Sequence, residues 1–236
     1  MNPTLEIEEL AISIVAPKFN PTLLTPDFLQ YSGIVPSDWQ LAREPVLNAQ
    51  MAHVAYTNGV NISVQLNAVT FSENIKAKAL ESVAVPSLVR KYVRALPNAS
   101  YQGIGINISA FFTFEGEGED APRNYIAKTL LAPGAWQEVG QELKTATVNL
   151  AYSLERGQFN LKIDDVQLRL ADNSPQAAVL FSGYFPYELV GDSPSSKLEN
   201  LYKIADNWRG DLEEYRQILA IFLGRSAGEL FSEPGE

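Results

Sequence analysis

The side chains that carry most enzyme chemistry are scarce in this chain. Its 236 residues include a single histidine, His53, and no cysteine. The lack of cysteine excludes disulfides, thiolate metal ligands, iron–sulfur clusters and cysteine nucleophiles. A serine–histidine–acid triad would need His53 beside a strand-to-helix nucleophile elbow, and we expect no such arrangement. We interpret His53, at the start of a predicted strand, as a packing or hydrogen-bonding residue.

Phosphate-binding and metal-binding patterns are also weak. Gly103-x-Gly105 has neither a third glycine nor a following helix, so it does not predict a dinucleotide site. The acidic run 115–120 could offer oxygen ligands to a hard cation, but it lacks the spacing of a calcium loop and predicts a solvated turn. Asp164 and Asp165 are neighbours in a predicted strand and point to opposite faces. We predict no catalytic residue, no metal site and no cofactor.

The net charge argues against a broad surface that binds nucleic acid or lipid, because the chain has 28 acidic and only 18 basic residues. Arg90, Lys91 and Arg94 form the one candidate basic cluster, which we interpret as a solvated helix face. No apolar run reaches the roughly 18 residues of a membrane span, and no signal-peptide pattern begins the chain. These features predict a cytoplasmic protein without a membrane partner.

Two aromatic positions recur about 97 residues apart, which indicates an internal repeat. Residues 34–40 contain Pro-x-x-Trp39-Gln, residues 131–137 contain Pro-x-x-Trp136-Gln, and Ala-Tyr56 matches Ala-Tyr152. These aromatic side chains can fill core pockets, or they can line a groove for a ligand or peptide. Trp39, Trp136, Tyr56 and Tyr152 are therefore candidate binding residues.

The elements that position these residues follow the same order in each half: strand, short helix, antiparallel strands, long helix. Thr25-Pro26 is typical of a helix start and Asn58-Gly59 of a hairpin turn. The first half is predicted to contain strand 5–15, helix 26–32, strands 51–57 and 60–71, and helix 86–96. The second is predicted to contain strand 101–114, helix 122–131, strands 143–154, 158–170 and 177–189, and a final helix.

The final helix begins at Ser193-Pro194 and carries apolar side chains at alternating spacings of three and four. Such a stripe can pack on the chain's own sheet or on a partner helix, and both alternatives remain open. The candidate partner-binding residues on this stripe are Leu201, Trp208, Leu212, Tyr215 and Leu219.

We predict an α+β fold of two tandem β-α-β-β-(β)-α repeats, about 4–97 and 99–224. The repeats would be related by pseudo-twofold symmetry, with a mainly antiparallel sheet and helices on one face. They would form one domain over 1–224, followed by a flexible tail at 225–236. The inferred order of elements resembles that of the TATA-box-binding protein family over most of the chain. That family's sheet is basic with intercalating aromatics, whereas this chain is acidic.

The function predicted from these observations is non-catalytic binding or assembly. The expected partner is another protein or a second copy, reached through the final helix or an exposed edge strand. One rival is a nucleic-acid-associated accessory protein that uses the sheet surface. Another is a metal-assisted hydrolase with Asp or Glu ligands from separate segments.

Overall fold

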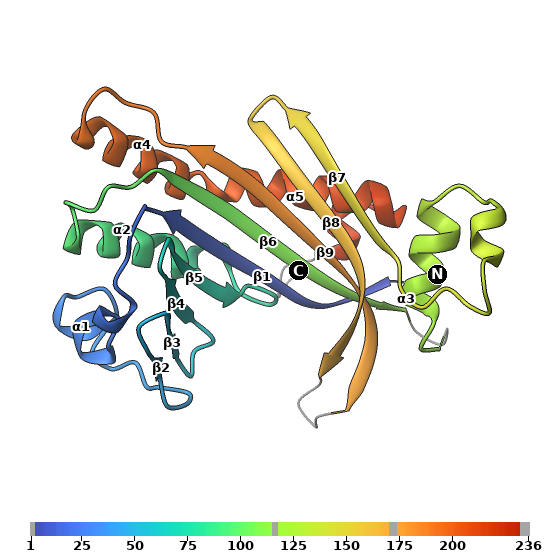
Figure 1. The fold of residues 1–236 in the computed structure, drawn as a ribbon, viewed down its shortest axis with the longest axis horizontal. Coiled ribbons are helices and arrows are strands. Elements are labelled where there is room, and N and C mark those ends of the chain that lie inside the picture. Colours follow the sequence, from blue (N-terminus) through green and yellow to red (C-terminus); the bar gives the residue numbers. More distant parts are fainter. Residues whose placement is uncertain (1–2, 115–117, 170–173, 232–236) are drawn as a thin grey trace. The chain divides into compact units, whose positions relative to one another are not determined.

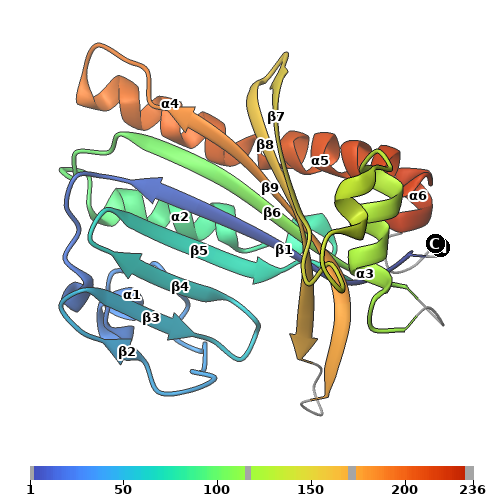
Figure 2. The same cartoon turned by 45° about the vertical axis from the view of Figure 1, so that its right-hand side comes forward.

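The computed structural model describes residues 3–114, 118–169 and 174–231. It confirms the α+β class, with nine strands in one antiparallel sheet in the order β2-β3-β4-β5-β1-β6-β9-β8-β7 (Figures 1 and 2). The strands are β1 (Pro3–Val15), β2 (Val46–Leu47), β3 (Met51–Ala55), β4 (Asn61–Gln65), β5 (Ala68–Asn74), β6 (Gly103–Phe114), β7 (Thr147–Leu154), β8 (Gly157–Arg169) and β9 (Pro175–Glu188). The α-helices are α1 (Pro26–Tyr31), α2 (Val85–Ala95), α3 (Ala121–Asn124), α4 (Pro194–Asp206), α5 (Trp208–Leu223) and α6 (Ala227–Leu230).

The chain forms two compact units, and each combines segments that are distant in sequence. Unit 1 contains Met1–Glu8, Ile108–Tyr184 and Glu213–Glu236, whereas unit 2 contains Glu9–Asn107 and Phe185–Leu212. The segment predicted as a tail includes α6, after which Phe231 is buried.

In unit 2, α2 supplies much of the core. One side of this helix is buried, and the Tyr92 ring packs edge-on against Phe71 of β5 with the ring centroids 5.4 Å apart. Val69, Phe71 and Glu73 are the buried residues of β5, because alternate residues of a strand share one face. Glu73 is the one charged member of that face.

Local capping chemistry explains the short helix α1. Thr25 Oγ1 accepts a hydrogen bond of 3.1 Å from the Phe28 amide, and Pro26 occupies the first helical position. Gly33 has φ +71°, a backbone conformation that favours glycine after a helix end. The predicted start and end of this helix are confirmed.

The predicted strand 60–71 is wrong, since it is two strands, β4 and β5, joined by a turn at Leu66 and Asn67. The burial pattern contains the reason. Ile62 and Val64 are buried at even positions, whereas Val69 and Phe71 are buried at odd positions. One continuous strand would have directed these two pairs to opposite faces, so the chain must turn between them.

In unit 1, the Tyr215 side chain packs against β9. Its hydroxyl donates a hydrogen bond of 2.8 Å to the Phe181 carbonyl oxygen, and the residue is fully buried. A Cβ atom on Gly183 would lie 2.6 Å from the Tyr215 ring, closer than real contacts allow. Glycine at position 183 therefore lets α5 approach this strand.

The predicted single C-terminal helix is instead two helices, α4 and α5, that meet at Asn207. Ser193 caps α4 as predicted, and its Oγ accepts a 3.2 Å hydrogen bond from the Ser196 amide. The Asn207 amide is shared between the Lys203 and Ile204 carbonyl oxygens, a pattern typical of a helix end. The break at Asn207 thus precedes Gly210, the residue of this span whose type least favours a helix interior apart from the proline at its start.

Candidate binding edge at strand β7

Strand β7 is the last strand of the sheet and pairs with β8 along its whole length. The antiparallel register runs from Thr147 opposite Asp164 to Leu154 opposite Gly157. Figures 1 and 2 show β7 as the outer strand of this hairpin. An edge strand has one row of backbone groups that its own sheet does not satisfy.

The hairpin turn fixes which residues of β7 direct their backbone outward. Two residues, Glu155 and Arg156, separate the closing pair Leu154 and Gly157. The closing pair of a two-residue loop exchanges both hydrogen bonds, and hydrogen bonding then alternates along the strand. The backbone N–H and C=O groups that face outward therefore belong to Thr147, Asn149, Ala151 and Ser153.

These outward groups have no partner within the described residues. The backbone hydrogen bonds outside regular elements do not involve positions 147–154. The Thr147 side chain donates to Asp164 of β8, at 2.7 Å, and leaves the outward backbone free.

The side chains of β7 are all uncharged. Thr147, Asn149, Ala151 and Ser153 are exposed, while the alternate apolar side chains are half-buried. The latter row comprises Val148, Leu150, Tyr152 and Leu154. Natural edge strands are usually protected by lysine, proline, a bulge or a covering segment. Within the described part of the chain, β7 has none of these protections.

The corresponding edge of β3 is covered by the chain itself. β2 pairs with β3 through Val46 opposite His53 and Leu47 opposite Ala52, and Leu41 forms an isolated bridge with Tyr56. Tyr56 is buried, whereas its sequence match Tyr152 in β7 is only half-buried. No segment among the described residues covers the β7 edge as β2 covers β3.

The four candidate aromatic residues divide between the two units. In unit 2, the Trp39 and Tyr56 rings meet edge-on with their centroids 5.2 Å apart, and burial raises the pKa of the Tyr56 hydroxyl to about 12. In unit 1, Tyr152 stacks on Phe159, while Trp136 is 41% exposed. Tyr152 is thus the aromatic candidate that lies on β7.

The candidate residues of the C-terminal stripe are core residues of this structure. Their side chains are at most 5% exposed, whereas the side chain of Ile221 on α5 is 80% exposed. A partner helix therefore has no access to the stripe. The buried set comprises Leu201, Trp208, Leu212, Tyr215 and Leu219.

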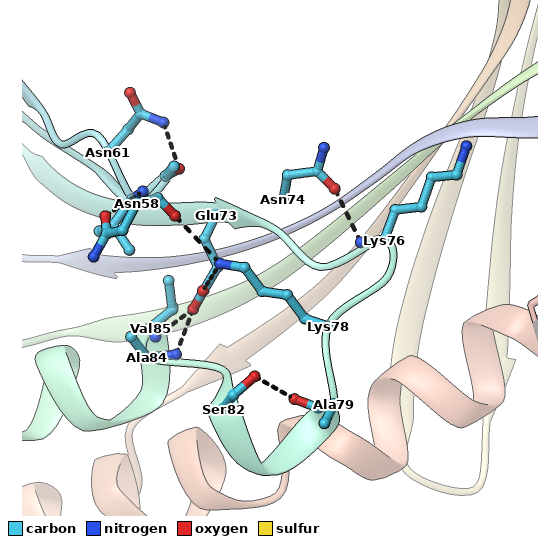
Figure 3. A network of polar contacts seen from close by, with 12 residues as sticks. Asn58, Asn61, Glu73, Asn74, Lys76, Lys78, Ala79, Ser82, Ala84 and Val85 are labelled. Atoms are coloured by element: carbon cyan, nitrogen blue, oxygen red, sulfur yellow. Dashed lines mark hydrogen bonds and ion pairs between the residues drawn. The ribbon is translucent and has the colours of Figure 1, made fainter. Parts of the chain in front are cut away.

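Unit 2 also contains a buried carboxylate, Glu73, at the N-terminus of α2 (Figure 3). Its Oε1 accepts hydrogen bonds from the amides of Ala84 (2.6 Å) and Val85 (2.7 Å), and its Oε2 pairs with Lys78 Nζ at 2.7 Å. Ala84 cannot cap α2 with its own side chain, so Glu73 of β5 satisfies these amides instead. We interpret this network as structural.

The remaining acidic candidates do not form a ligand cluster. Asp164 binds Thr147 and Lys162, while Asp165 binds Thr145 and the Ala146 amide. Glu115 and Glu117 lie outside the described residues. Among the residues that the structure does describe, no three acidic or histidine side chains are placed to share a metal ion.

The sequence contains one Gly-x-Ser-x-Gly string, at residues 224–228, that the prediction did not consider. In hydrolases this string can mark a nucleophilic serine. The serine of this string, Ser226, follows helix α5 rather than a strand, and so lacks the context of a nucleophile elbow. Its Oγ instead accepts a hydrogen bond from the Glu229 amide at 3.3 Å and caps α6. This serine has a structural role.

The basic cluster on α2 is partly neutralised inside unit 2. Arg90 forms an ion pair with Asp206 and lies over the Tyr202 ring, 5.0 Å from its centroid. Arg94 is exposed and Lys91 is half-buried. The pairing of Arg90 reduces the positive charge available to a phosphate backbone.

His53 lies beside Arg43, whose Nη2 is 3.2 Å from the imidazole Nδ1. Burial and, to a smaller extent, this guanidinium lower the pKa of His53 from 6.5. We expect the single imidazole to titrate below pH 6.5 in an NMR experiment. Since the unfolded chain then binds the proton more readily, stability should rise with pH between the folded and unfolded pKa values.

Replacement of Arg43 with glutamine should move the His53 pKa upward only in part, because burial is the larger cause. A pKa at or above 6.5 in the native protein would contradict this account of the site.

The chain matches no protein-family model, and no curated protein is significantly similar to it. Across residues 3–114, 118–169 and 174–231, no helix has both the length and the apolar character required to cross a membrane. The cytoplasmic location stays a prediction.

Proposed function

We propose that this chain is a non-catalytic binding protein that assembles with its partner by strand addition at β7. The observation that carries the proposal is the uncharged edge, whose outward backbone groups have no partner among the described residues. In strand addition, main-chain hydrogen bonds supply affinity and alternate side chains supply specificity. The C-terminal stripe is a weaker candidate because its side chains are buried.

The proposal includes an internal duplication with the strand order of the TATA-box-binding protein family. Strands β2-β3-β4-β5-β1 are followed by β6-β9-β8-β7, so each half has its first strand beside its last. In this scheme β7 corresponds to β3, in agreement with the match between Tyr56 and Tyr152. Within the described residues no strand of the second half corresponds to β2, which accounts for the uncovered edge.

A labelled peptide that copies residues 146–154 tests this function. We expect it to bind the full chain, as measured by fluorescence anisotropy, and to bind the Ala151→Pro variant about fivefold more weakly. Proline removes an outward N–H and one hydrogen bond of roughly 1 kcal/mol. Proline is tolerated at an edge position whose N–H faces solvent, so the hairpin itself should survive.

The matched control is Ala151→Thr, which keeps the backbone N–H and suits a strand. This variant should bind the peptide as the unmodified chain does. Circular dichroism of both variants would report whether the sheet remains intact. Equal affinity for the proline and threonine variants would refute strand addition at β7.

A further inference from the structure

We infer that the strand added to β7 is β7 of a second copy, paired antiparallel about a twofold axis at Leu150. This inference rests on the proposed function and names the partner. Its basis is the self-complementarity of β7 in backbone direction, side-chain pattern and charge. Each of these three properties restricts how two identical edges can meet.

Backbone direction restricts the register first. The outward groups of one copy belong to odd-numbered residues, Thr147 to Ser153, and must face outward groups of the other. Odd positions therefore pair with odd positions, and the apolar even positions pair with one another on one face. Registers shifted by a single residue would place apolar side chains opposite polar ones.

The overlap of the two strands selects one register among those that remain. With Leu150 opposite its own copy, Thr147 faces Ser153 of the second copy and Asn149 faces Ala151 of the second copy. All four outward residues of each strand are then paired. With Ala151 on the axis instead, Thr147 would face Glu155 of the second copy, which lies in the hairpin turn.

The cross-strand side-chain pairs of this register are favourable. Val148 lies opposite Tyr152 of the second copy, which pairs a β-branched side chain with an aromatic one. Thr147 lies opposite Ser153 of the second copy, which pairs two hydroxyl side chains. Both kinds of pair stabilise antiparallel sheets. Leu150 pairs with its own copy, which extends the half-buried apolar row across the junction.

Charge supports a second copy as the partner. The net charge is −10, so two copies repel one another at most surfaces. Twofold pairing also places the side chains nearest the axis close to their own copies, where a charged residue would meet the same charge. β7 is uncharged, and on β8 the Lys162 ammonium and the Asp164 carboxylate pair at 2.7 Å. Two copies of this edge therefore do not repel one another. The edge also has no unpaired charge on β7 that would attract a partner of opposite charge.

Cysteine cross-linking tests the register, because the chain has no native cysteine. We expect sedimentation equilibrium to show a dimer and Leu150→Cys to form an intermolecular disulfide under mild oxidation. Opposed residues of a non-hydrogen-bonded antiparallel pair have Cα atoms about 4.5 Å apart, within disulfide range. Sedimentation of the unmodified chain gives an answer even where a variant folds poorly.

Val148→Cys is the matched control, since in this register its own copy lies four residues along the strand, roughly 14 Å away. It should not cross-link alone, but it should cross-link with Tyr152→Cys when the two variants are mixed. Rapid cross-linking of Ala151→Cys without cross-linking of Leu150→Cys would overturn the register and the proposed pairing.

The peptide of residues 146–154 separates failure of this inference from failure of the proposed function. A monomer that binds the peptide at β7 would retain strand addition and overturn self-pairing. A monomer that does not bind the peptide would overturn both. A dimer that persists unchanged in the Ala151→Pro variant would place the dimer contact elsewhere and overturn the inference.

Discussion

Replacing Glu73 with glutamine should lower the free energy of unfolding by about 3 kcal/mol. The carboxylate is 1% exposed, accepts hydrogen bonds from two amides of α2 and pairs with Lys78. The neutral amide loses the ion pair, and its NH₂ group cannot accept a hydrogen bond from either partner. Urea denaturation followed by circular dichroism would measure the change.

Glu142→Gln is the control for this prediction. Glu142 also pairs with a lysine, Lys144, but both side chains are exposed. Exposed ion pairs contribute little because water and salt screen them. We expect no measurable change for this variant. If Glu73→Gln also left the free energy of unfolding unchanged, the carboxylate would not be the group that holds the start of α2 on β5.

Replacing Leu219 with alanine should cost about 3 kcal/mol of stability, because its side chain is completely buried. The matched variant on the same helix is Ile221→Ala, whose side chain is 80% exposed. That change should cost less than about 0.5 kcal/mol. Thermal or urea unfolding of the two variants in parallel would measure the difference.

The same pair of variants decides whether the C-terminal stripe belongs to the core. A core residue stabilises each chain by itself, so the cost of Leu219→Ala should not vary with protein concentration. A cost that appeared only at concentrations where the protein is oligomeric would place Leu219 at an interface.

Local chemistry made several elements predictable from sequence. Thr25-Pro26 and Ser193-Pro194 start helices because the hydroxyl groups and the fixed φ of proline act within one turn. Gly59 adopts positive φ (+88°) in the turn between β3 and β4, and the Asn58 Oδ1 accepts a hydrogen bond of 3.1 Å from the Val60 amide, whereas the positive φ predicted for Asn58 does not occur. Interactions between near neighbours in sequence determine such features, so no knowledge of the fold is needed.

Elements that depend on distant segments were harder to predict. The two-residue strand β2 exists through its pairing with β3, and its sequence has no strand period of its own. The cap of α2 comes from Glu73 on another element, which a search for local capping residues cannot find. The switch of the apolar residues from even to odd positions, between Val64 and Val69, is visible in the sequence. It could have been used to predict β4 and β5 as separate strands.

The candidate site was predictable only in general terms. An edge strand was among the expected contact surfaces, and Tyr152 was among the candidate residues. Sequence alone could not rank the strands within the sheet, so it could not identify β7 as the outermost one. The signal that was available is the eight-residue run from Thr147 to Leu154, which alternates in polarity and carries no charge.

The composition of the two compact units has a consequence for how the chain acquires its structure. Unit 1 requires both ends of the chain, and the Arg216 guanidinium of α5 holds the buried Glu8 carboxylate of β1 through contacts of 2.9 and 2.6 Å. Unit 2 in turn includes α4. Neither unit can be completed until the C-terminal helices have left the ribosome. Although the chain reads as two successive halves, neither half should therefore fold as an isolated fragment.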